Sequence, residues 1–176
     1  MLIITTLIAT AAALECSEDA DQCMPLGNAT IERDGDYLYV ECDSRCAVAV
    51  RGSQVNRITI TEGHGAITLD HNIALVVVSG SEDADLIDVS GSPVPAEVDG
   101  GAGADTIIGT AFEDALSGGY GNDTIQGLDG VDHIRGGQGD DTLQGGGGLD
   151  TIIGGRGEDA CLDAITARQC ESGVVP

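Results

Sequence analysis

A period of nine residues runs through the C-terminal half of the chain without an insertion. Aligned from Gly100, seven consecutive units end at Leu162. Each unit has glycine at its first position and aspartate at its sixth, and its eighth position is Ile or Leu, or Cys161 in the last unit. Seven unbroken units do not arise from biased composition. The pattern therefore predicts a repetitive fold in which every unit forms the same small structure.

The units also match the nonapeptide G-G-x-G-x-D-x-U-x, in which U is a large apolar residue. The segment from Gly100 to Leu162, about a third of the 176 residues, thus resembles the hemolysin-type calcium-binding (RTX) repeats. The resemblance implies an all-β fold, a right-handed parallel β-roll or β-helix solenoid in which two units complete one turn. It also implies that six residues of each unit form a loop that binds Ca²⁺, followed by a strand of three residues.

Physical chemistry agrees with these expectations. A three-residue strand points its middle side chain inward, so one aliphatic residue per unit suits a two-sheet roll. Loop glycines permit positive φ and let carbonyl groups face a cation, and calcium prefers six to eight oxygen ligands. Stacked turns lie about 4.8 Å apart. At that distance two carboxylates repel by roughly 3 kcal/mol if the effective dielectric constant is near 20. The aspartate rows therefore require counterions.

Two units per turn would place alternate aspartates on opposite edges of the roll. The expected calcium ligands of one edge are the residues Asp105, Asp123, Asp141, Asp159, Gly101, Gly103, Gly119, Gly121, Gly137, Gly139, Gly155 and Gly157. The other edge offers Asp114, Asp132 and Asp150. Its loops depart from the consensus at Phe112, Leu128, Val131 and Leu149. We expect three sites on the first edge and two weaker or partly empty sites on the second. All five would fill alike if the apolar side chains point outward.

The same pitch continues upstream without the aspartate-glycine loops. Apolar residues nine positions apart are Ile60, Leu69, Val78 and Ile87. We therefore predict metal-free parallel β-helix coils over residues 44–99, which cap the calcium-binding roll of residues 100–162.

Two details of this upstream segment bear on its frame. The frame of the repeats already holds between Gly91 and Asp99, with Ala96 at the aspartate position, and Val89-Ser90 is interpreted as an insertion of two residues. Asp83 and Asp85 would lie beneath Asp105 and could complete one extra site.

Both ends of the chain suggest export. Residues 1–14 are uncharged and apolar and end in Ala11-x-Ala13 and Leu14, so residues 1–13 are expected to be a signal peptide. A buried first strand is the alternative. Six cysteines, an even number, agree with a secreted, extracellular or cell-surface protein. Cys161 and Cys170 are expected to pair and to hold residues 163–176 as a C-terminal cap. An N-terminal cap over residues 14–43 would be stabilised by disulfides with three possible connectivities among Cys16, Cys23, Cys42 and Cys46.

The formal net charge of −23 limits the possible partners. It argues against nucleic acid and against insertion into an anionic membrane, because both would repel the chain. We expect a non-enzymatic calcium-binding protein with a structural or adhesion role, whose protein or polysaccharide partner the sequence does not reveal. One alternative is a polysaccharide lyase or epimerase acting on acidic sugars, although the seven arginines are scattered. Another is an ice-binding surface on the outward-facing residues Thr106, Thr124 and Thr142.

Overall fold

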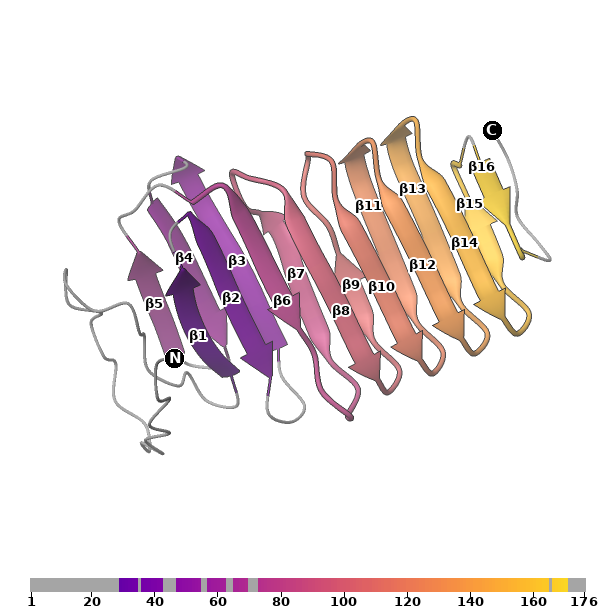
Figure 1. The fold of residues 1–176 in the computed structure, drawn as a ribbon, viewed down its shortest axis with the longest axis horizontal. Helices are drawn as coiled ribbons and strands as arrows, with labels where there is room; N and C mark the ends of the chain where they lie inside the picture. Colours follow the sequence, from indigo (N-terminus) through magenta and orange to yellow (C-terminus); the bar gives the residue numbers. More distant parts are fainter. Residues whose placement is uncertain are drawn as a thin grey trace.

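The protein forms an elongated solenoid built entirely of strands in the part of the chain that the structure describes. The computed structural model describes residues 29–34, 36–42, 47–54, 57–62, 65–69, 73–164 and 166–170. Two sheets face each other over about five turns, and the strands succeed one another along the long axis of the molecule (Figure 1). The predicted all-β solenoid is confirmed.

Each sheet has eight strands. In sheet A the spatial order is β1 (Ala29–Asp34), β2 (Tyr37–Cys42), β6 (Leu75–Ser79), β8 (Ala96–Ala102), β10 (Ala115–Tyr120), β12 (His133–Gln138), β14 (Thr151–Arg156) and β16 (Thr166–Arg168). In sheet B it is β15 (Ala160–Leu162), β13 (Thr142–Gly148), β11 (Thr124–Gly130), β9 (Thr106–Ile108), β7 (Leu86–Gly91), β3 (Ala47–Gln54), β4 (Arg57–Glu62) and β5 (Gly65–Leu69).

The register of the parallel strands follows the sequence repeat. Leu116 of β10 lies opposite Val98 of β8 on one side and Ile134 of β12 on the other. In sheet B, Ile125 lies between Ile107 and Leu143 in the same way. Neighbouring strands are thus offset by 18 residues, which is two nonapeptides. The prediction that two units complete one turn is therefore confirmed.

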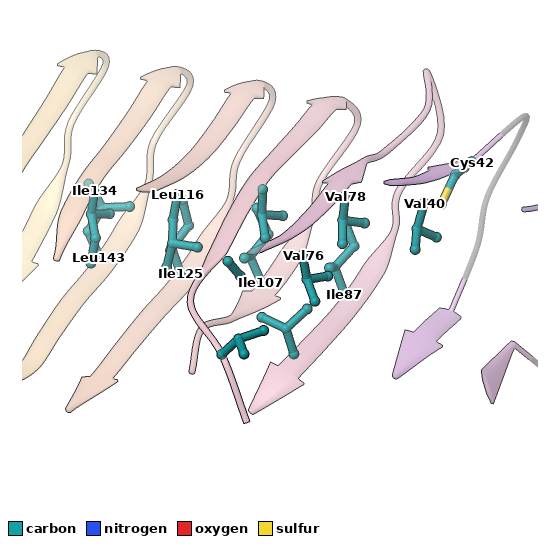
Figure 2. Close-up of a cluster of buried hydrophobic side chains, with 14 of the residues drawn as sticks. Val40, Cys42, Val76, Val78, Ile87, Ile107, Leu116, Ile125, Ile134 and Leu143 are labelled. Atoms are coloured by element: carbon teal, nitrogen blue, oxygen red, sulfur yellow. The ribbon is translucent and has the colours of Figure 1, made fainter. Parts of the chain in front are cut away.

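The core between the sheets is a thin double row of aliphatic side chains (Figure 2). Every eighth position of a unit is buried, and these residues are Val98, Ile107, Leu116, Ile125, Ile134, Leu143, Ile152 and Cys161. Their exposed fractions are 2% or less. The single inward-facing position per unit therefore supplies the whole hydrophobic interior of the repeat region, as the three-residue strands predict.

Part of the expectation for residues 44–99 is wrong. Strands β3, β4 and β5 pair antiparallel, with Ile58 opposite Leu69 and Ile60 opposite Ile67 in the β4–β5 pair. Two residues separate each of these strands from the next, and such short connections permit hairpins but not parallel pairing within one sheet. Residues that recur at intervals of nine also alternate at intervals of two here, so the spacing alone did not distinguish the two arrangements. Parallel coils begin with β2 and β3, and β6, β7 and β8 continue them.

The frame of the repeats starts before Gly100, as expected. The backbone N–H of Ala96 donates to Asp114 across 18 residues, whereas the equivalent bond from Asp85 to Asp105 spans 20 residues. The difference shows that two extra residues lie between Asp85 and Ala96, in agreement with the insertion inferred at Val89-Ser90. The β3–β7 register shifts by one residue between Asp88 and Gly91.

The C-terminal end is closed by a short strand and a disulfide. Cys161 and Cys170 are bonded, with their Cα atoms 5.9 Å apart, which confirms the expected pair. Strand β16 places Ala167 opposite Ile152, three residues earlier than the repeat frame would place it. Cys42 is also disulfide-bonded. The expected signal peptide and Cys16, Cys23 and Cys46 lie outside the described residues. No helix in the described part of the chain is long and apolar enough to cross a membrane.

Candidate metal centre

The loops of the repeats form two rows along opposite edges of the roll. The first edge consists of the loops 100–105, 118–123, 136–141 and 154–159, which lie along the lower side in Figure 1. The second edge comprises the loops 109–114, 127–132 and 145–150, along the upper side. Each loop connects a strand of one sheet with a strand of the other, so loops of one edge stack directly on one another.

Hydrogen bonds join the aspartates of each edge into a ladder. Asp123 Oδ1 accepts the backbone N–H of Asp105 at 2.9 Å, and Asp141 Oδ1 accepts that of Asp123 at 2.9 Å. On the second edge Asp132 Oδ1 accepts the N–H of Asp114 at 3.0 Å. The structure therefore brings together all seven predicted aspartates, each 1% exposed or less: Asp105, Asp123, Asp141 and Asp159 on the first edge, and Asp114, Asp132 and Asp150 on the second.

The second carboxylate oxygen, Oδ2, lacks a hydrogen bond in most of these aspartates. Oδ2 is buried and has no hydrogen-bond partner in five of the aspartates: Asp105, Asp123, Asp132, Asp141 and Asp150. A buried carboxylate oxygen without a partner is costly, and native proteins seldom leave one unless an ion or water satisfies it. These five oxygen atoms are therefore the first sign of a ligand at the edges.

Beside most of the first-position glycines, a small space receives this oxygen together with a carbonyl oxygen of the next turn. A Cβ atom on Gly100 would lie 2.5 Å from Asp105 Oδ2 and 2.7 Å from the carbonyl oxygen of Gly118. On the second edge, a Cβ on Gly127 would meet Asp132 Oδ2 and the carbonyl oxygen of Gly145. Only glycine leaves this space open. Two hard oxygen ligands from successive turns converge there, which is the kind of donor set that calcium prefers.

The second and fourth glycines of the first-edge loops allow the turns to stack closely. All eight predicted loop glycines have positive φ: Gly101, Gly103, Gly119, Gly121, Gly137, Gly139, Gly155 and Gly157. A Cβ on Gly119 would collide with the carbonyl oxygen of Gly101 in the preceding turn. Backbone conformation and close approach therefore both require glycine at these positions. Within the described residues, no three His, Cys, Asp or Glu side chains form a metal-binding group.

Two loops of the second edge have the same conformation despite their apolar residues. Leu128 has φ 80°, and Gly130, Gly146 and Gly148 also have positive φ. The side chains of Val131 and Leu149 are 42% and 65% exposed, so they point away from the aspartate ladder. The departures from consensus at these positions leave the loop conformation intact.

The loop 109–114 is the one that differs among the seven. Neither Thr110 nor Phe112 has positive φ. The N–H of Thr110 donates to Asp114 Oδ2 at 2.6 Å, and its hydroxyl donates to Asp114 Oδ1 at 2.8 Å. Sequence reasoning missed Thr110, although the replacement of the second-position glycine was visible. Phe112 replaces glycine in a loop that is already closed by hydrogen bonds.

The buried position of the ladder carboxyls changes their acidity. Burial, together with repulsion from neighbouring carboxylates, raises the pKa of Asp105, Asp123 and Asp141 to about 6, although the bonds from backbone N–H groups offset part of the rise. For the same reasons the pKa of Asp132 rises to about 7. Burial also raises the pKa of Asp114, but the hydrogen bonds from Thr110 and Ala96 lower it in part. A cation beside these carboxyls would favour their ionised form.

Comparison with known families agrees with this geometry. The family model of the RTX calcium-binding nonapeptide repeat (4 copies) matches residues 99–134 and 126–160. The roll is made of RTX calcium-binding repeats. Its cofactor is accordingly Ca²⁺, which RTX repeats bind. No curated protein and no solved structure matched the chain. The residues matched by the family model include all the loops of both edges of the RTX roll.

Proposed function

We propose that the protein is a secreted or cell-surface calcium-binding protein whose RTX roll is folded and stabilised by Ca²⁺, with a structural or adhesion role. The observation that carries the proposal is the row of buried Oδ2 atoms without hydrogen-bond partners. Four of them lie beside a space shared with a carbonyl oxygen of the next turn, those of Asp105, Asp132, Asp141 and Asp150. Burying these oxygens in their ionised form is favourable only if a cation neutralises them. RTX repeats generally serve as structural elements that bind calcium, which supports a non-enzymatic role.

The proposed ligands are those expected from the sequence. On the first edge, ions would lie between successive loops, bound by the carboxylates of Asp105, Asp123, Asp141 and Asp159 and by the carbonyls of the loop glycines. On the second edge, the carboxylates of Asp114, Asp132 and Asp150 would have the same role. Calcium bound there supplies positive charge between the rungs of each ladder. The residues of the chain hold successive turns at the correct spacing, because each Oδ1 already anchors the neighbouring backbone.

The disulfide and the expected affinity support an extracellular site of action. Disulfides such as Cys161–Cys170 persist in oxidising compartments. Extracellular calcium-binding modules have dissociation constants of about 10⁻⁴ to 10⁻³ M. Calcium at about millimolar concentration would therefore fold the roll after export. A structural or adhesion role follows from the shape, since two extended outer sheet faces become rigid only when calcium is present.

Circular dichroism combined with calcium-binding stoichiometry tests this proposal. The full chain should gain β structure over residues 100–162 when calcium is added, while the upstream strands are partly ordered beforehand. Equilibrium dialysis with ⁴⁵Ca should show several ions per chain at about millimolar calcium. A chain that is equally rich in β structure in excess chelator, or that binds no calcium, would contradict the proposed function.

A further inference from the structure

Two loops on opposite edges of the roll are closed by a hydroxyl side chain. In loop 109–114, Thr110 donates its N–H and its hydroxyl to Asp114, and Phe112 N–H donates to Thr110 Oγ1 at 3.0 Å. In loop 80–85, which precedes the consensus repeats, Ser81 donates its N–H at 2.7 Å and its hydroxyl at 2.9 Å to Asp85 Oδ2.

The two loops share a third contact. Asp83 N–H donates to Ser81 Oγ at 3.1 Å, as Phe112 N–H does to Thr110. The same three donors therefore occur twice, in loops with different sequences, although the hydroxyl donates to Oδ1 of Asp114 and to Oδ2 of Asp85. Both loops have Ser or Thr at the second position and a residue other than glycine at the fourth, where the open loops have glycine with positive φ.

These contacts satisfy the carboxylate oxygen that is left without a partner elsewhere. Asp114 Oδ2 faces the same kind of space as its counterparts, because a Cβ on Gly109 would lie 2.7 Å from it and 2.7 Å from the carbonyl oxygen of Gly127. At this level, however, the N–H of Thr110 already donates to Oδ2. The difference between a closed and an open loop thus lies in the donors beside the carboxylate, and the position of the aspartate is unchanged.

We propose that Ser81 and Thr110 take the place of a calcium ion, so that loops 80–85 and 109–114 are metal-independent. This inference rests on the proposed function and specifies its sites. Calcium then binds only between two open loops, which leaves three gaps on the first edge and the gap between loops 127–132 and 145–150 on the second. The expected fifth site, between Asp114 and Asp132, and the extra site at Asp85 are excluded.

The closed loops stand at the start of each ladder. Asp85 N–H donates to Asp105 Oδ1 at 2.8 Å, and Asp114 N–H donates to Asp132 Oδ1 at 3.0 Å. Each hydroxyl-closed loop therefore presents a positioned backbone donor to the first open loop above it. In the absence of calcium, these two loops provide an ordered surface on which the first calcium-binding turn can form.

Opening the closed loops with glycine tests the inference. The variants Thr110→Gly/Phe112→Gly and Ser81→Gly/Asp83→Gly restore glycine at the second and fourth positions of each loop. In equilibrium dialysis with ⁴⁵Ca, each full-length double variant should bind one more ion per chain than the unchanged protein. The matched control is Phe112→Gly alone, which keeps Thr110 and should leave the number of ions unchanged.

The possible outcomes separate the inference from the proposed function. If both double variants reach the circular dichroism of the unchanged protein in calcium but bind no additional ion, the inference is wrong and calcium-dependent folding still stands. Failure of both variants to gain β structure at saturating calcium would also overturn it, because calcium would then be unable to replace the hydroxyl group. If the unchanged protein binds no calcium, the proposed function itself fails.

Discussion

Asp141 allows the role of one carboxylate in binding calcium to be separated from its role in the backbone ladder. Its Oδ1 accepts the N–H of Asp123 at 2.9 Å, and its Oδ2 is buried without a partner beside Gly136. The substitution Asp141→Asn keeps the volume and the Oδ1 acceptor, and it replaces Oδ2 with an amide group that repels a cation. The backbone contact should therefore survive while the calcium site is lost.

The expected magnitude follows from linkage. Each ion that binds only the folded state adds about 1.4 kcal/mol to the free energy of unfolding for every tenfold rise in calcium. The loss of one site should lower this slope by about 1.4 kcal/mol per decade. At a calcium concentration 100-fold above the dissociation constant, the loss in stability should be about 2.7 kcal/mol.

Urea unfolding followed by circular dichroism at several calcium concentrations measures this slope. The matched control is Asp140→Asn, the same change in the neighbouring residue. Asp140 is exposed, and its Oδ1 accepts the N–H of Glu158 at 2.9 Å, a bond that asparagine can also make. The control should keep the slope. If Asp141→Asn lowers stability equally at all calcium concentrations, its carboxylate has only a structural role and the reasoning is refuted.

Three further predictions follow from the same geometry. Gly136 does not have a positive φ, so alanine fits its backbone, but the Cβ of Gly136→Ala would lie 2.6 Å from the carbonyl oxygen of Gly154 and against Asp141 Oδ2. Dialysis of this variant should show one calcium ion fewer per chain. An unchanged number of ions would contradict a calcium site between these two oxygens. Replacing Asp123 and Asp141 together by Ala should raise the calcium concentration for half-folding more than replacing Asp132 and Asp150, because the first edge has more open gaps; equal shifts in circular dichroism titrations would argue against this. In chelator, the pKa values of the buried carboxyls are about 6 to 7 in the roll and about 3.9 in the unfolded chain, so folding takes up protons. The stability that this proton uptake gives to the calcium-free roll is complete below about pH 4 and is lost as the pH rises through 6 to 7. In chelator, β structure at pH 5 should therefore exceed that at pH 8, and the reverse order would contradict the pKa shifts.

The repeat region could be predicted almost entirely from the sequence, because the inward aliphatic position and the loop glycines recur at fixed spacing. Ile125 and Asp123 occupy the positions that the period requires. The directions of Val131 and Leu149 could not be predicted, since a loop side chain can point outward or across the ladder with the same spacing. The apolar substitutions therefore left open whether the second edge has the loop conformation of the first.

Hydrogen bonding accounts for the site residues that the sequence did not reveal. Whether Thr110 satisfies Asp114 depends on the direction of its N–H, which φ at the second position determines. The hairpins of β3, β4 and β5 were missed for a different reason. Their apolar residues fit both a nine-residue coil and a two-residue alternation, and only the short connections distinguish the two.

The offset of 18 residues between neighbouring strands of the repeat region has a consequence for the length of the molecule. Removal of residues 118–135 would join Ser117 to Gly136 and place the loop of Asp141 directly on that of Asp105. Every strand would then meet a partner with the same pattern of inward and outward positions. The roll can therefore shorten or lengthen by whole turns of about 4.8 Å while the upstream strands and the disulfide-closed C-terminal end keep their contacts. The number of units thus sets the length of the molecule.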